Sequence, residues 1–251
     1  MLCHNPLCIF VHVPKTAGQS IERYFLDLLG LTDEQRPTLL LGKNRDPRLG
    51  PPQLSHLRAA EYVSGGFVSE QEFRDAFKFS FVRNPWDRIV SFYKYRGHAY
   101  RYDFKTFLFR HLPKAGWTND YCHIMPQSAY LYAGDECQVD FIGRFENLQA
   151  DFEAVCRTLG TPVRALPHAN KSLHPHTVLS VLRGERRKIL RNLKRIARRG
   201  RMRRNTFGHY SEYYDDESRD YVQQLYHDDV TSFGYRFEDR RTPPVQKPNA
   251  V

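Results

Sequence analysis

The N-terminal part of the chain contains an apolar run that leads directly into a short loop and then a helix. Residues 8–13 are continuously apolar or β-branched except for His12, and the run stops at Pro14. Such a run is typical of a buried strand covered on both faces. After the loop 14–20, apolar residues recur at helical spacing until Gly30, a natural helix stop. This strand, loop and helix unit restricts the chain to folds that contain such a crossover.

A second strand is predicted at residues 76–82, which alternate apolar and polar side chains and end at Arg83. The next residues have the pattern of a helix start. Asn84 suits the N-cap, Pro85 suits the first helical position, and the carboxylate of Asp87 favours the helix N-terminus. The chain therefore has a second junction between a strand and a helix.

A third strand is predicted over 139–145, followed by a helix that stops at Gly160. Residues 31–54 contain several prolines and are expected to be an irregular connection. A last helix is expected over about 215–229. Alternating strands and helices favour a mostly parallel sheet, and 251 residues are enough for one such α/β domain.

The positive charge of the chain is concentrated in one segment. The formal net charge is +10, but residues 183–204 alone carry twelve Lys or Arg and one Glu. The rest of the chain is almost neutral, and its 41% hydrophobic content excludes general disorder. A basic amphipathic helix is predicted over 178–200. Such charge repels itself unless an anion relieves it, so a sulfated or acidic glycan, an anionic membrane surface and nucleic acid are all open as partners. The apolar stripe of this helix could instead dock on the main domain or on a second subunit.

The cysteines and the N-terminus narrow the class of protein further. The five cysteines form no CxxC pair, so a zinc site is not expected. Free thiols are expected, with a Cys122–Cys137 disulfide as the alternative in an oxidising compartment. The N-terminus shows neither a basic leader nor a long apolar segment, so no signal peptide or membrane span is expected. We therefore expect a cytoplasmic protein.

Both junctions carry residues suited to binding anions. The first N–H groups of a helix lack partners and attract negative charge, and Lys15 adds a full positive charge beside them. The order of Lys15 and Gly18 differs from that of a Walker A loop, so ATP hydrolysis is not the first choice. At the second junction, Arg83 ends the strand and Ser91 follows two helical turns later. Because ligands collect at the carboxyl ends of parallel strands, both loops can serve one ligand with two separated phosphates.

The two segments also resemble known motifs. Phe10-Val11-His12-Val13-Pro14-Lys15-Thr16-Ala17-Gly18-Gln19-Ser20 and Phe81-Val82-Arg83-Asn84-Pro85-Trp86-Asp87-Arg88-Ile89-Val90-Ser91 are similar to the nucleotide-binding motifs of PAPS-dependent sulfotransferases. The likeness is strongest to the carbohydrate sulfotransferase group called family 2. The resemblance implies that Arg83 and Ser91 bind the 3′-phosphate of PAPS. It implies that the 5′-phosphosulfate is held by Lys15, Thr16, Ala17, Gly18, Gln19 and Ser20. Gln19 departs from the Thr or Ser that the family usually has there.

The resemblance extends over most of the chain. Residues 125–128, 141–148 and 209–237 are also similar to the family. It implies a P-loop-like, mostly parallel sheet flanked by helices in a single domain, residues 1–240. This domain would carry a basic helical insertion at about 178–205, longer than in compact members, and a flexible tail at 241–251.

Sulfuryl transfer needs a base for the acceptor proton and a positive group for the leaving phosphate. Lys15 suits the second role. An imidazole suits the first, since its ordinary pKa lies near neutral pH. His56 is similar to the family's histidine between the two motifs and is the favoured base, although a helix-start or core histidine would look the same. His168 and His174 are next in line. Glu146 is a fallback base, but an ion pair with Arg144 or Arg83 is the favoured explanation for this residue. Gln127 and Ser128 could contact the acceptor or the nucleotide, or could simply start a helix.

The sequence thus predicts an enzyme that transfers a sulfuryl group from PAPS to a hydroxyl acceptor, a glycan or glycolipid, without a metal. Residues 183–204 would add an anionic polymer or membrane surface as partner, with nucleic acid not favoured. The alternative is a non-catalytic protein that binds nucleotides or polyanions through the basic helix.

Overall fold

The computed structural model describes residues 1–46, 48, 50–112, 120–167 and 207–240. The basic helix predicted over 178–200 and the predicted tail at 241–251 lie outside these residues. So do two of the candidate histidines, His168 and His174.

The core of the molecule is a four-stranded sheet in the order β1-β2-β3-β6. Its strands are β1 (Leu2–His4), β2 (Leu7–Val11), β3 (Phe77–Val82) and β6 (Phe141–Arg144). β3 is parallel to both β2 and β6, whereas β1 is an antiparallel edge strand beside β2. The three predicted strands are therefore confirmed, as is the mostly parallel α/β fold.

The N-terminal part differs from the prediction in one strand boundary and in one additional strand. The first strand ends at Val11 rather than Val13, because the Val13 N–H turns back to the Val11 carbonyl (3.1 Å) and leaves the ladder. The edge strand β1 was not predicted, since three residues give too short a pattern to detect.

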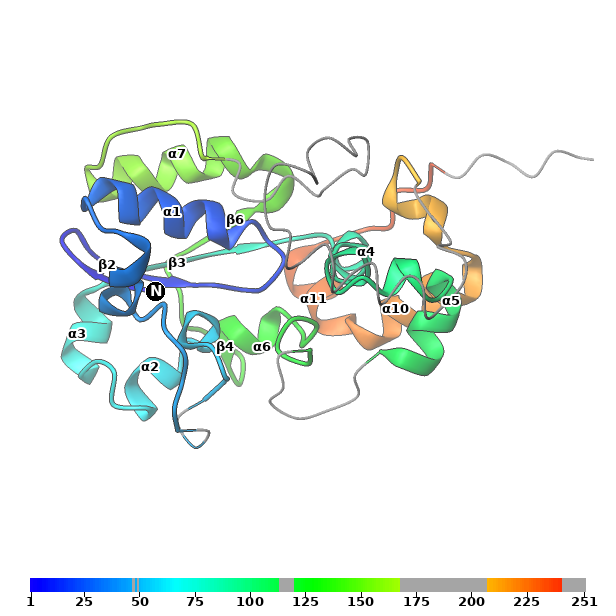
Figure 1. Cartoon of the computed structure of the whole chain (residues 1–251), viewed down its shortest axis with the longest axis horizontal. Coiled ribbons are helices and arrows are strands. Elements are labelled where there is room, and N and C mark those ends of the chain that lie inside the picture. Colours follow the sequence, from blue (N-terminus) through cyan, green and yellow to red (C-terminus); the bar gives the residue numbers. More distant parts are fainter. Residues whose placement is uncertain (47, 49, 113–119, 168–206, 241–251) are drawn as a thin grey trace, which may run out of the picture.

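Helices cover both faces of the sheet (Figure 1). One face carries α1 (Gly18–Leu28) and α7 (Leu148–Leu159), and the other carries α2 (Glu61–Ser64), α3 (Glu70–Asp75) and α6 (Ser128–Leu131). At the carboxyl ends of the parallel strands lie α4 (Pro85–Tyr95), α5 (Phe104–Thr106), α10 (Asp216–Leu225) and α11 (His227–Phe233). Short 3₁₀ segments span Asp33–Leu39, Leu54–His56, His98–Tyr100, Phe145–Asn147 and Tyr210–Tyr213, Phe107–His111 form a π-helical turn, and β4 (Tyr132–Ala133) pairs with β5 (Glu136–Cys137).

Alternating side chains of the strands divide the core into two layers. Phe10 of β2 and Phe79 of β3 stack at 5.1 Å and pack with residues of α1 and α7. Ile9 and Val11 point the other way, into the larger cluster that contains the buried residues of α4. This two-sided burial explains why the sequence of β2 is continuously apolar.

The start of α4 forms as predicted. The Asn84 side chain accepts hydrogen bonds from the N–H groups of Trp86 (3.1 Å) and Asp87 (3.4 Å), and Pro85 occupies the first turn. This cap fixes the point where the chain leaves β3, and so it fixes the position of Arg83.

The C-terminal helix prediction needs a correction. The segment predicted as one helix over 215–229 forms α10 and α11, with a break at Tyr226. The Tyr226 ring is buried and its hydroxyl donates to the Ile124 carbonyl. This long-range contact replaces regular helix geometry at that residue. The predicted irregular connection over 31–54 likewise contains the 3₁₀ helix Asp33–Leu39.

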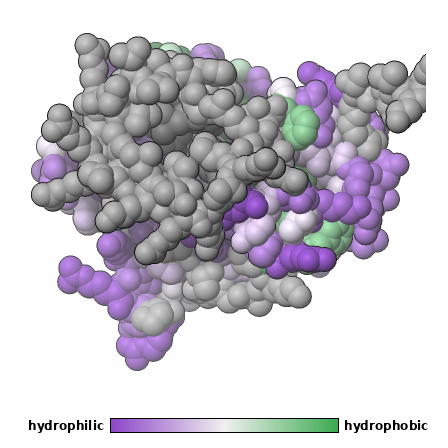
Figure 2. All heavy atoms as spheres, turned by 45° about the vertical axis from the view of Figure 1, so that its right-hand side comes forward, coloured by the Kyte–Doolittle hydropathy of each residue, from purple (hydrophilic) through white to green (hydrophobic). Residues whose placement is uncertain are grey.

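The surface drawn in Figure 2 is mostly hydrophilic where it is described, with hydrophobic residues in small separate patches. Among the described residues, no helix combines the length and the apolar character needed to cross a membrane.

Gly143 tests the close packing between β3 and β6. A Cβ atom at this position would lie 2.4 Å from the Phe81 ring, whereas at Gly42 the nearest atom would be 3.5 Å away. We expect Gly143→Ala to lower the free energy of unfolding by about 1–3 kcal/mol, as overpacking does. Urea unfolding should show this loss and only a small change for Gly42→Ala. Equal effects of the two changes would contradict the packing described.

Candidate functional site

The loop between β2 and α1 has an unusual backbone. Lys15 and Ala17 have positive φ angles of 73° and 68°, a conformation uncommon outside glycine. The Thr16 hydroxyl donates to the Val13 carbonyl (2.8 Å) and holds this shape, so its hydrogen serves the loop itself. Successive N–H groups in such a conformation form a concave anion-binding nest, here at the N-terminus of α1. The backbone thus supports the predicted anion cradle.

His12 lies directly beneath this loop. A Cβ atom on Gly18 would come within 2.1 Å of the His12 ring, so only glycine allows the loop to approach so closely. His12 Nδ1 lies 2.7 Å from the buried Glu22 carboxylate, which also pairs with Arg36 at 2.5 Å. Burial raises the pKa of Glu22, but His12 and Arg36 lower it more, so the net pKa is below its ordinary value.

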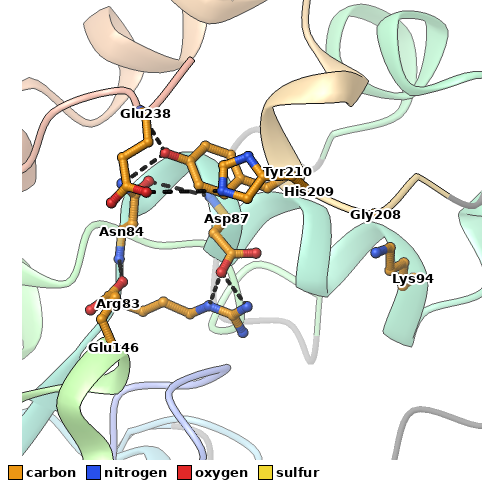
Figure 3. A pocket seen from close by; sticks show the side chains of 9 residues that line it. All are labelled: Arg83, Asn84, Asp87, Lys94, Glu146, Gly208, His209, Tyr210 and Glu238. Atoms are coloured by element: carbon orange, nitrogen blue, oxygen red, sulfur yellow. Dashed lines mark hydrogen bonds and ion pairs between the residues drawn. The ribbon is translucent and has the colours of Figure 1, made fainter. Parts of the chain in front are cut away.

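Arg83 joins the second motif to the first. Its Nη1 donates to the Lys15 carbonyl (3.3 Å), and its Nε and Nη2 donate to Asp87 (3.0 and 2.5 Å). The guanidinium also lies 3.9 Å from the centre of the Phe145 ring. Figure 3 shows the Arg83 and Asp87 side chains facing each other. Two segments 68 residues apart in sequence therefore meet at one guanidinium.

Ser91 lies on the face of α4 that is directed toward these groups. It is four residues after Asp87 and four before Tyr95, and residues at this spacing share a helix face. Asp87 binds Arg83, and the Tyr95 ring lies 3.8 Å from Lys15 Nζ. The predicted ligands of the two phosphates are thus on neighbouring surfaces. Gln19 is exposed and Ser20 half-buried, and the Ser20 N–H is used within α1, where it donates to Ala17.

Arg88 is a buried residue beside the candidate site that the sequence reasoning missed. It is only 1% exposed, and its guanidinium donates to the carbonyls of Pro14 (3.0 Å), Met125 (2.9 Å) and His123 (3.2 Å). The available signal was its position on α4, because Arg88 lies four residues before Phe92 and therefore on the buried face.

His56 lies beside the loop, at the end of a 3₁₀ turn. It is 8% exposed, its Nδ1 lies 3.3 Å from the His12 carbonyl, and its ring contacts those of His12 (4.7 Å) and His123 (5.3 Å). A carbonyl can only accept, so Nδ1 carries the hydrogen and Nε2 is left as the proton acceptor. Burial, and then the neighbouring His12 and His123, lower the pKa of His56 well below 6.5. His56 is thus neutral at neutral pH, as a general base must be.

Gln127 and Ser128 both have structural partners. Gln127 bonds the Arg83 backbone through both ends of its side-chain amide, at 2.8 Å each. The buried Asp229 accepts from the N–H groups of Gln127 and Ser128 (2.8 Å each), so the helix-start interpretation accounts for both residues.

Glu146 accepts from the Asn84 N–H (2.7 Å) and the Tyr235 hydroxyl (3.0 Å). The expected ion pair of Glu146 with Arg83 or Arg144 is therefore wrong, because backbone and phenol donors occupy the carboxylate instead.

A pocket of about 330 Å³ adjoins Arg83 on the side of the C-terminal segment (Figure 3). It is lined by Arg83, Asn84, Asp87, Lys94, Glu146, Gly208, His209, Tyr210 and Glu238. Its size is in the range of small-molecule sites, so there is room for a ligand next to Arg83. Within the described residues there is no group of three or more side chains that could hold a metal ion.

The contact between Gly18 and His12 can be tested directly. We expect Gly18→Ala to lower the free energy of unfolding by about 1–3 kcal/mol, because the new Cβ meets a ring that a buried hydrogen bond to Glu22 holds in place. Ala17→Gly is the control, since glycine adopts the same positive φ without strain. Urea unfolding of the two variants should differ, and a fully stable Gly18→Ala protein would contradict the close approach.

Comparisons with known proteins identify the family of this chain. A model described as "Sulfotransferase family" matches residues 2–236, from β1 to the segment after α11. An "Uncharacterized protein" of Archaeoglobus fulgidus is 36% identical over 97 residues, which cover 38% of this chain and 77% of that protein. No solved structure matches. Because the family model matches residues 2–236, which include all four strands of the sheet and both strand-to-helix junctions, the chain belongs to the Sulfotransferase family.

Proposed function

We propose that this protein transfers a sulfuryl group from PAPS to a hydroxyl group of a carbohydrate or glycoconjugate. Membership of the family supports sulfuryl transfer in general. The observation that carries the choice of donor is the bond from Arg83 to the Lys15 carbonyl. It brings two anion-binding motifs together, and a donor with phosphates at both its 5′ and 3′ positions matches such a pair.

The 5′ end of the donor is assigned to the nest and to Lys15. The residues proposed to hold it are Lys15, Thr16, Ala17, Gly18, Gln19 and Ser20. Burial, together with Arg83 and Arg88, lowers the pKa of Lys15 to about 8, so the ammonium is still charged at neutral pH. A positive charge there stabilises the phosphate that leaves when its bond to sulfur breaks. The 3′-phosphate is assigned to Arg83 and Ser91.

His56 is proposed as the general base. The acceptor oxygen forms a bond to sulfur, the bond between sulfur and the bridging oxygen of PAPS breaks, and the acceptor proton moves to Nε2 of His56. The negative charge then rests on the phosphate of the product PAP, next to Lys15. Since Nδ1 is directed to the His12 carbonyl, Nε2 is the nitrogen free to take this proton.

A non-catalytic protein that binds nucleotides or polyanions is the alternative function. Such a protein would need the anion-binding nest of the loop 14–20 and the basic segment 183–204. It would not need a neutral histidine such as His56 beside the nest. The geometry of His56 favours the enzyme. We further propose a cytoplasmic protein that meets an anionic polymer or membrane surface through residues 183–204.

The choice of donor can be tested by ligand binding. Thermal shift assays should show strong stabilisation by PAP and much weaker stabilisation by ATP, because two phosphate sites at fixed separation select the 3′-phosphate. In Arg83→Ala most of this preference should disappear. Undiminished preference for PAP in that variant would remove Arg83 from the site.

The role of His56 as the base can be tested by substitution. We expect His56→Ala to bind PAP as the wild type does, while transfer from labelled PAPS falls by about 10²- to 10⁴-fold, the usual contribution of a general base. Lys15→Ala should impair both. Acceptors are found first by screening the wild type against glycans, glycolipids and small phenols. Full turnover by His56→Ala would place the base elsewhere, with His168 or His174 next.

The same step predicts the pH dependence of transfer. The lowered pKa of His56 places the acid limb of kcat/KM below pH 6.5, because the imidazole accepts a proton only while neutral.

A further inference from the structure

Lys15 is an ammonium group with little electrostatic compensation. Arg83 donates to the Lys15 carbonyl, and Arg88 donates to the carbonyl of the preceding Pro14. Two guanidinium groups therefore face the residue from α4 and its N-terminal junction. The carboxylate on that helix, Asp87, is bound to Arg83. In the part of the chain that the structure describes, the Lys15 ammonium is found in no ion pair with a carboxylate.

Its partner is instead the ring of Tyr95, whose centre lies 3.8 Å from Nζ. Tyr95 is the last residue of α4, and its side chain is 52% exposed. The ring also stacks on that of His123 at 5.6 Å, with an angle of 24° between the planes. The exposed Tyr95 ring is thus held in orientation by His123 and lies against Lys15 of the loop 14–20.

The contact has a defined physical effect. The face of an aromatic ring is negative and attracts a cation, and this attraction grows when the cation is withdrawn from water. It favours the charged form of lysine, whereas burial and the two arginines disfavour it. Among the described residues, the groups next to Lys15 are the guanidinium groups of Arg83 and Arg88 and the ring of Tyr95, and His123 stacks on that ring.

We propose that Tyr95 is a positioning residue of the donor site. Its ring keeps the Lys15 ammonium charged and holds it beside the loop 14–20 until an anionic ligand binds to that ammonium. Tyr95 belongs to neither of the residue sets that the sequence resemblance assigned to the phosphates. The identity of that anion as the 5′ end of PAPS rests on the proposed function. The effect of the ring on Lys15 does not.

The test first measures Lys15 without any ligand. NMR titration of the labelled lysine side chain is compared among the wild type, Tyr95→Leu and Tyr95→Phe. Leucine keeps apolar bulk without a π face, and phenylalanine keeps the face. We expect the midpoint of Lys15 to fall by about half to one pH unit in Tyr95→Leu and to stay unchanged in Tyr95→Phe. Phe109→Leu is the matched control, because this exposed ring packs on Tyr221 instead.

The second measurement is PAP affinity between pH 6 and 10, by calorimetry. The pKa of Lys15, lowered to about 8, implies that wild-type affinity weakens above pH 8 as the ammonium is lost. A midpoint lowered by half to one unit makes Tyr95→Leu about two- to sixfold weaker at pH 8 and nearly equal to wild type at pH 6.5. Tyr95→Phe should follow the wild type throughout.

The outcomes separate the two proposals. An unchanged Lys15 midpoint in Tyr95→Leu, or a loss of PAP affinity that is equal at every pH, overturns the role of Tyr95. If instead the Lys15 midpoint shifts as expected but the wild type shows no preference for PAP over AMP, the Tyr95 inference stands and the proposed donor fails.

Discussion

The buried guanidinium of Arg88 is the interaction on which the candidate site depends. Its three hydrogen bonds join α4 to the loop at Pro14 and to the segment that contains His123 and Met125. A buried charge is costly unless it is fully bonded, and removal of such a group leaves several carbonyls without donors. This one side chain therefore fixes the distances among the parts that carry Lys15, Ser91 and His123.

The same arrangement explains which features could be predicted from the sequence. α4 was predictable because its start depends on local residues, namely the Asn84 cap and Pro85. β2 was predictable because burial on both faces makes it continuously apolar, and β3 because its phenylalanines alternate with other residues. Lys15 and Arg83 could be brought together in advance, since the carboxyl ends of parallel strands meet at one edge of a sheet.

Other features depend on contacts that no local pattern encodes. His56 was chosen by resemblance alone, and its tautomer is set by the carbonyl of His12, 44 residues away in sequence. The break between α10 and α11 follows from a contact of Tyr226 with Ile124, 102 residues away. The Tyr95 ring looked like any exposed aromatic until the loop placed Lys15 over it. Long-range contacts of this kind arise only when the whole fold forms.

The pairing of Arg83 with Asp87 bears on how a phosphate can be bound at the second motif. A guanidinium has five N–H groups, and the bonds to Asp87 and the Lys15 carbonyl account for three of them. The bonds to Asp87 use Nε and Nη2, which form one edge of the group. One hydrogen is left on each Nη atom. The proposed 3′-phosphate could accept from both without displacing Asp87, which would then hold the guanidinium plane in place.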